Sequence, residues 1–376
     1  MQNKHLFSLL AFTMLAACSV GPHYERPQFY PDAEVAKNLK LEQAEASPVG
    51  QDWYKQFNDP ALNRLIERAW AASPNVRIAV HKLREARYGL LRSNVQSFPM
   101  LDINAGYNYD RSSRDIGFSI DRDYYQLGMD ASWELDIWGG NRRAAEASRA
   151  LFEAAGANLD NVRLVMAAEV AKNYISLRTA QEQLRVAREN LKLQQEIYQL
   201  VQQKYDVGLT DFIALNQAQY AVESTKTLIP QLESEIEAYK NAVAVLLGVL
   251  PDDLAGTLDN TADNLVRRRL SYNLKQLYRL RVDVIRNRPD VRLAEQNLIA
   301  QNAAVGEAVA NLYPDVSISG FVGWQSGKIA GLINGDHSTY SYAPALKLPF
   351  FHWNQLMNTV NEQKEVKEQY VLSYQN

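Results

Sequence analysis

The sequence RPDVRLAEQ (residues 288–296) is nearly repeated by SPNVRIAVH (residues 73–81). An offset of 215 residues aligns the two copies, with Pro74 on Pro289, Val76 on Val291, Arg77 on Arg292 and, beyond them, Pro99 on Pro314. Further along, WELDIWGGN (residues 133–141) aligns with LKLPFFHWN (residues 346–354) at an offset of 213. The sequence therefore contains a duplicated supersecondary unit.

Length and charge limit the class of protein. The chain has 376 residues, which exceeds the usual size of one compact domain unless the fold is an elongated repeat. Its formal net charge is -3 and its pI is near 6.0, and no half is conspicuously basic. A nucleic-acid partner is therefore not expected.

The N-terminus is typical of an exported lipoprotein. Residues 1–17 have a basic start followed by an apolar stretch too short to span a bilayer, as in a signal peptide. They end in Leu15-Ala16-Ala17 before Cys18, a sequence that resembles a bacterial lipobox. We expect Cys18 to carry acyl chains as a membrane anchor, with an ordinary buried cysteine as the alternative. Residues 18–59 are then predicted to be a lipid-anchored tether that is extended in its Pro-rich part.

Two helices are predicted over residues 60–98, with Leu62, Leu65, Ile66 and Ala69 on one face of the first. From residue 99 to 138 the period changes to two, which predicts a β-hairpin with one apolar and one polar face. The apolar positions include Leu127, Met129, Leu135 and Ile137, and the polar positions include Asp130, Glu134 and Asp136. The second copy repeats a helix over residues 288–313 and a hairpin over 314–352.

Alternation alone leaves two interpretations open. Strands of about ten residues with aromatic side chains near their ends suit a transmembrane barrel, and they also suit a soluble antiparallel sheet with one wet face. Four strands cannot close a membrane barrel, because open edges in lipid leave backbone groups unpaired. A membrane barrel would therefore need several copies, and three copies would supply twelve strands.

A long helical hairpin is predicted over residues 139–249. Apolar residues recur every seven positions, which predicts coiled-coil packing: Val170, Leu177, Leu184, Leu191, Tyr198 and Tyr205. The sequence DVGLTD (residues 206–211) predicts a turn, with Thr210 or Asp211 capping the return helix. Pro230 predicts a bend or a break in that helix. Residues 250–287 are predicted to be mixed, and residues 353–376 begin a further helix.

Several motifs together resemble the TolC-like outer membrane efflux proteins, and more narrowly their lipoprotein subgroup. The motifs are the two copies around Arg288, Pro289, Asp290 and Arg292, the VGPHYERP segment, the WELDIWGG strand end and the VGLTD turn. The resemblance implies a mainly α fold with β: two repeats of a β-hairpin plus long coiled-coil helices. Three protomers would share a twelve-stranded outer-membrane barrel above a periplasmic α-helical barrel.

The resemblance also implies a function. Members are passive outer-membrane channels that receive drugs or other small toxic compounds from an inner-membrane pump through a periplasmic adaptor. It implies that Gly208, Leu209 and Thr210 form the tip that contacts the adaptor. Asp130, Glu134 and Asp136 are expected to face water inside the barrel, either favouring cations weakly or simply solvating the wall. Arg288, Pro289, Asp290 and Arg292 are expected to form a structural hub, and no cofactor is expected beyond the lipid on Cys18.

Three other functions remain as alternatives. A hydrolase could use Glu134 and Asp136 as an acid and base pair, although the histidines are scattered and no G-x-S-x-G or H-E-x-x-H motif occurs. A periplasmic coiled-coil scaffold or adaptor would share the long helices, and a channel for type I protein secretion would share the family fold. If the second repeat were as long as the first, its helical hairpin would end roughly 85 residues beyond Asn376. We therefore expect this chain by itself not to form a sealed channel.

Overall fold

The computed structural model describes residues 19–27, 52–111, 121–259, 266 and 286–376. The chain divides into two compact units. The first, here the sheet unit, comprises Met1–Pro31, Leu83–Gly156 and Asp290–Asn376. The second, here the hairpin unit, comprises Asp32–Lys82 and Ala157–Pro289. The predicted signal peptide, Cys18 and most of segment 260–285 lie outside the described residues.

The hairpin unit begins with short elements that pack on two long helices. It contains η1 (Trp53–Phe57), α3 (Pro60–Ala72), the start of α4 (Pro74–Val95), most of α5 (Gly140–Asp206), α6 (Phe212–Leu247), η3 (Pro251–Leu254) and α7 (Ala255–Leu258). Asp59 caps α3 by accepting from the backbone N–H groups of Ala61 and Leu62, and Pro60 takes the first helical position. The four predicted apolar residues of α3 are buried, which confirms that face.

The heptad stripe of α5 supplies much of the core of this unit. Val170 and Leu177 are fully buried, and Leu184 is nearly so. Ala180 and Ala187, three residues after successive heptad positions, are buried as well. Small residues between the larger ones let a neighbouring helix approach closely, so the predicted coiled-coil packing is confirmed over this part of α5.

The return helix α6 starts and stops where the turn chemistry predicts. Asp211, rather than Thr210, is its N-cap, and the carboxylate accepts from the Ala214 N–H at 2.8 Å. Gly248 ends the helix in the left-handed conformation. The helix continues through Pro230 without a break, so one of the two predicted effects of this proline does not occur.

The sheet unit preserves the duplication, with equal lengths in two pairs of its elements. It contains the end of α4, β1 (Met100–Arg111), β2 (Asp121–Glu134), the start of α5, α10 (Pro289–Ala310), β3 (Asp315–Ser326), β4 (Ser338–Lys347) and α11 (Trp353–Gln375). The offset of 215 carries both ends of α4 onto those of α10 and both ends of β1 onto those of β3. The prolines that begin α4 and α10 explain their matched starts, since proline fits the first turn of a helix.

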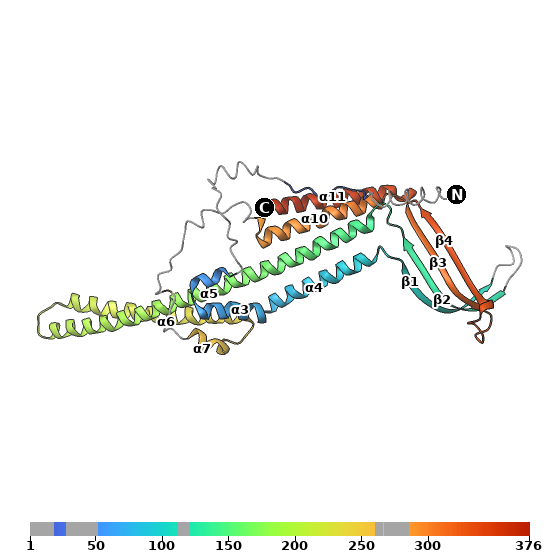
Figure 1. Ribbon diagram of the computed structural model, residues 1–376. Coiled ribbons are helices and arrows are strands. Elements are labelled where there is room, and N and C mark those ends of the chain that lie inside the picture. The colour runs from blue at the N-terminus through green and yellow to red at the C-terminus, as the bar shows by residue number, and fades with distance from the viewer. Residues whose placement is uncertain (1–18, 28–51, 112–120, 260–265, 267–285) are drawn as a thin grey trace. The chain divides into compact units, whose positions relative to one another are not determined.

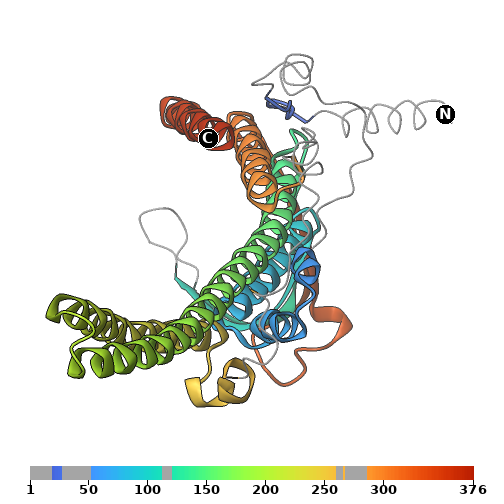
Figure 2. The same ribbon diagram turned by 90° about the vertical axis from the view of Figure 1, so that its left-hand side faces the viewer.

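The four strands form one antiparallel sheet in the order β1-β2-β3-β4 (Figure 1). The middle pair, β2 with β3, joins the two repeats; Glu134 lies opposite Ser317. Two elements of the second repeat, α10 and α11, lie side by side in Figures 1 and 2. The Gln301 side-chain amide donates to Gln363 across them.

Within the described residues, no single helix has both the length and the apolar character needed to cross a membrane. Among the helices that the structure describes, α6 taken together with the bent segment Pro251–Leu258 is the one pair that meets that criterion, on length and composition.

Candidate functional site: strand faces, strap and helical tip

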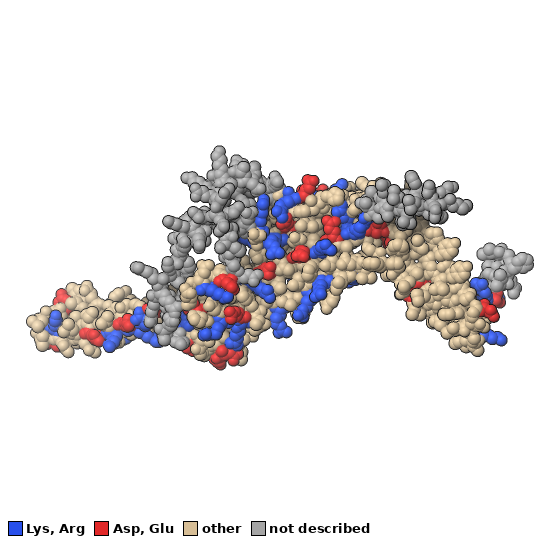
Figure 3. All heavy atoms as spheres, viewed as in Figure 1, with Lys and Arg blue, Asp and Glu red and all other residues tan. Residues whose placement is uncertain are grey.

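The register gives the sheet one polar and one apolar face. Residues opposite each other share a face. The pairing therefore unites the polar positions Asp102, Asn104, Gln126, Asp130, Ser132, Ser319 and Gln325. The other face carries Ile103, Tyr107, Leu127, Met129, Val322, Trp324, Tyr340 and Tyr342. Figure 3 shows the visible side of the strands as largely uncharged, in contrast to the helices.

Asp130 lies on the polar face as predicted. Its carboxylate accepts a hydrogen bond from the Asn104 side chain, and Asp102 is its direct cross-strand neighbour. Two carboxylates directly opposite each other repel, and the Asn104 amide offsets part of this repulsion by donating to one of them. Glu134 shares this face and is exposed at the end of β2.

Asp136 has a different role from the predicted one. The prediction that the strand continues to Ile137 is wrong, because β2 ends at Glu134. The Asp136 carboxylate accepts from the backbone N–H groups of Asn141 and Arg142 at 3.1 and 3.0 Å, and it pairs with the Arg142 guanidinium. The exposed N–H groups at the start of α5 favour a carboxylate there. Asp136 therefore caps α5 beyond the end of β2.

An aromatic side chain on the polar face was not anticipated. The Phe321 ring lies against Gly128 and Gly323, where any side chain on either glycine would collide with it. The two glycines face each other across β2 and β3. An opposed glycine pair beside an aromatic residue is the sequence signal that could have revealed this contact.

The predicted tether is tightly docked where it is described. We call residues 19–27 the strap. The Val20 N–H donates to the Trp138 carbonyl, and the Arg143 and Asn302 side chains donate to strap carbonyls at Val20 and Pro22. Gly21 has φ of +90°, and a Cβ added there would lie 2.5 Å from the Gly306 Cα. The strap therefore leaves no room for a side chain at Gly21, and a Cβ at Gly306 would lie 2.9 Å from the Arg143 side chain that donates to the strap.

A buried carboxylate fixes the end of the strap. Glu295 on α10 accepts from the Arg26 guanidinium at 2.6 Å and from the Tyr24 hydroxyl at 3.2 Å. Burial, together with the Glu295 charge, raises the pKa of Tyr24 to about 12. Sequence reasoning missed this cluster, because its members are separated by about 270 residues and show no local pattern.

The turn between α5 and α6 exposes an apolar tip. Gly208 is left-handed at φ of 75°, and the Gly208 and Leu209 N–H groups bond to the Tyr205 and Lys204 carbonyls, which is a Schellman motif. Leu209 is 77% exposed, and the other large apolar residues of the tip, Val207, Phe212 and Ile213, are each at least 60% exposed. Such a cluster of exposed apolar residues typically marks a surface that binds another protein.

The predicted hub residues lie at the start of α10. Pro289 takes its first position and Asp290 its first turn, as predicted. The Asp290 carboxylate accepts from the Val291 N–H at 2.9 Å. The wider hub role of Arg288 and Arg292 stays a prediction.

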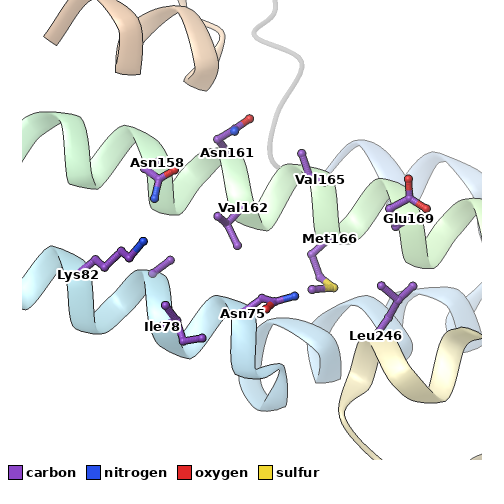
Figure 4. A pocket seen from close by; sticks show the side chains of 11 residues that line it. Asn75, Ile78, Lys82, Asn158, Asn161, Val162, Val165, Met166, Glu169 and Leu246 are labelled. Carbon is purple, nitrogen blue, oxygen red and sulfur yellow. The ribbon is translucent and has the colours of Figure 1, made fainter. Parts of the chain in front are cut away.

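A groove in the hairpin unit lies between α4, α5 and α6 (Figure 4). Its volume is about 430 Å³, and its walls include Ile78, Val165 and Met166. Lys82 and Glu169 are the titratable residues among its described lining, and the other polar groups are asparagine amides. Across the described residues, no cluster of three or more His, Cys, Asp or Glu side chains could hold a metal ion.

Comparison with known proteins agrees with this arrangement. The family model for outer membrane efflux proteins matches residues 65–249 and 280–376. The probable outer membrane lipoprotein SilC of Salmonella typhimurium is 27% identical over 98% of this chain and 79% of its own length. The toluene efflux pump outer membrane protein TtgF of Pseudomonas putida is 26% identical over 99% of this chain and 78% of its own. The solved outer-membrane channel OprN is 32% identical with a TM-score of 0.82, covering 95% of this chain and 79% of that one. The chain belongs to the outer membrane efflux protein family.

Proposed function

We propose that this chain is the outer-membrane channel component of a tripartite efflux system and acts as a passive conduit for small toxic compounds. The observation that carries the proposal is the sheet: four strands with one apolar and one polar face, whose outer edges have no partner within the described chain. Backbone groups at an open edge are costly in lipid, so the edges need partner strands. Three copies would supply twelve strands, enough for a closed barrel.

In such a barrel the polar face would line the water-filled interior. Asp130 and Glu134 would then face the passage, while Leu127 and Met129 would face lipid. An acidic lining favours cations weakly and needs no catalytic chemistry. The energy for export would come from the inner-membrane pump.

Two further parts of the chain fit this function. The apolar tip around Gly208, Leu209 and Thr210 would contact a periplasmic adaptor, because its exposed side chains gain from burial by a partner. Acylation of Cys18 would anchor the strap end in the outer membrane, and it is the one covalent group the function needs. Loss of palmitate labelling in a Cys18→Ala variant would test the anchor.

The assembly and the activity can be tested together. The chain is produced in a strain that lacks its own outer-membrane channel but keeps an adaptor and pump. A heat-sensitive oligomer of three chains on gels, together with a lower cellular accumulation of a fluorescent efflux substrate, would support the proposal. The same result would show that the expectation of an unsealed channel is wrong. A monomer that leaves accumulation unchanged would contradict the proposal, and protein export without any change in accumulation would favour a secretion channel instead.

A further inference from the structure

We propose that β4 of one copy pairs with β1 of the next in a single register, with Lys347 opposite Asp102 of the neighbouring copy. The inference rests on the proposed function, in which copies of this chain share one barrel. Both strands lie at the edges of the sheet, and each has a side without a strand partner in the described chain. The register follows from the duplication, from side-chain chemistry and from barrel geometry.

The duplication supplies a template for the contact between copies. Within one chain, the first repeat meets the second through β2 and β3, and Glu134 lies opposite Ser317. The offset of 213 carries Glu134, the last residue of β2, onto Lys347, the last residue of β4. The offset of 215 that relates β1 to β3 carries Asp102 onto Ser317. The equivalent contact between copies therefore pairs Lys347 with Asp102.

The side chains agree with this register. A lysine directly opposite an aspartate is a favourable cross-strand pair. On the other face, Tyr342 would lie opposite Tyr107 and Tyr340 opposite Tyr109, and paired aromatic side chains are also favourable. Positions on the polar face meet polar-face positions throughout, so both faces of the sheet continue without interruption from copy to copy.

Barrel closure separates this register from its nearest rival. Adding the observed registers to the proposed one over three copies gives a shear of about 18 and a strand tilt of about 45°, from the usual strand spacing and rise. The rival register takes its offset from strand pairing within the two hairpins, which aligns β2 with β4 at 215 residues instead of 213. At that offset, Lys347 of one copy would lie opposite Asn104 of the next. The rival needs a tilt of about 54°, outside the roughly 35–45° of membrane barrels.

Disulfide trapping tests the register in the full-length protein within outer membranes. One cysteine is fixed by Ala345→Cys, and it is combined in turn with Asn104→Cys, Gly106→Cys or Asp102→Cys, all on the polar face. The proposed register places position 345 opposite position 104. Directly opposite Cβ atoms lie within disulfide range, whereas positions two residues away do not, so we expect about tenfold more covalently linked chains with Asn104→Cys.

Matched pairs keep the test interpretable. Ser132→Cys with Ser319→Cys joins observed partners within one chain and shows that oxidation proceeds without linking chains. Ser341→Cys with Asn108→Cys should repeat the expected result if the first variant folds poorly. Preferential linkage with Gly106→Cys or Asp102→Cys would overturn the register but leave the shared barrel intact. A heat-sensitive oligomer without any link would overturn the edge contact, and a monomer would overturn the proposed function as well.

Discussion

Arg178 shows how single residues hold the hairpin unit together. It is a fully buried charge on α5 whose guanidinium donates to the Thr257 and Leu258 carbonyls at the end of α7 and stacks on the Tyr174 ring. Arg178→Met would leave both carbonyls without these donors, so we expect a loss of about 3 kcal/mol in the free energy of unfolding. Urea unfolding followed by circular dichroism in detergent would measure it.

A matched arginine on the same helix provides the control. Arg185 pairs with Glu182 and Glu189, but its side chain is 41% exposed. Because solvent screens exposed ion pairs, Arg185→Met should cost less than about 1 kcal/mol. Equal losses for the two variants would show that burial of Arg178 contributes nothing to stability.

Tyr174 predicts a pH dependence at alkaline pH. Burial, together with Asp59, which accepts its hydroxyl hydrogen bond, raises the pKa of Tyr174 from 10.0 to about 12 although Arg178 opposes the shift. The folded protein therefore binds more protons than the unfolded chain between pH 10 and pH 12. Stability is fully present below pH 10 and falls as the pH rises through this window.

Replacing the hydroxyl should remove this contribution. We expect the free energy of unfolding of Tyr174→Phe to fall less steeply than that of the original protein between pH 10 and pH 12. Tyr24 has a shift of the same sign, but it is present in both proteins and cancels from the comparison. Parallel curves would mean that Tyr174 titrates in the folded state as it does in the unfolded chain.

At the scale of elements, the strap depends on glycine. A side chain at Gly21 would meet the Gly306 backbone at 2.5 Å, and its φ is left-handed, so Gly21→Ala should displace the strap from α10. We expect limited proteolysis to cut the N-terminal segment of this variant at least about tenfold faster, as for an element released from its packing.

The control is a glycine inside a helix. Gly89 on α4 has nothing within 4 Å of an added Cβ, so Gly89→Ala should raise helix stability by about 0.5–1 kcal/mol without changing proteolysis of the strap. Faster cleavage in both variants would show that the effect at Gly21 is not specific to strap docking.

The elements that the sequence predicts are those with local signals. Proline positions predict the starts of α3, α4 and α10, and the DVGLTD turn predicts the break between α5 and α6. The predicted end of β2 is wrong. The apolar and polar residues of the sequence continue to alternate as far as Ile137, whereas the Asp136 carboxylate caps α5. Strap docking carries no periodic signal, because its side-chain contacts join residues between 122 and 280 positions apart.

At the scale of the whole molecule, assembly with an adaptor should depend on the apolar tip. Leu209→Glu places a charge where the proposed contact buries an apolar side chain, so we expect adaptor binding to fall by at least about tenfold while the oligomer survives. Pull-down of the adaptor from detergent extracts would measure this binding.

The control is a charge added elsewhere on the hairpin. Gln217→Glu adds the same charge to an exposed position of α6, and this variant should bind the adaptor normally. Loss of the oligomer in Leu209→Glu would show instead that the tip serves assembly of the chain itself.

Two pairs of elements related by the duplication have equal lengths, whereas β2 has 14 residues and β4 has 10. α4 and α10 both have 22 residues, and β1 and β3 both have 12, although most side chains differ between the copies. An inserted residue would turn every later helical position by about 100° and move every later strand residue to the opposite face. Substitutions are local by comparison. Within these four elements the two copies therefore differ by substitution and not by any net change in the number of residues.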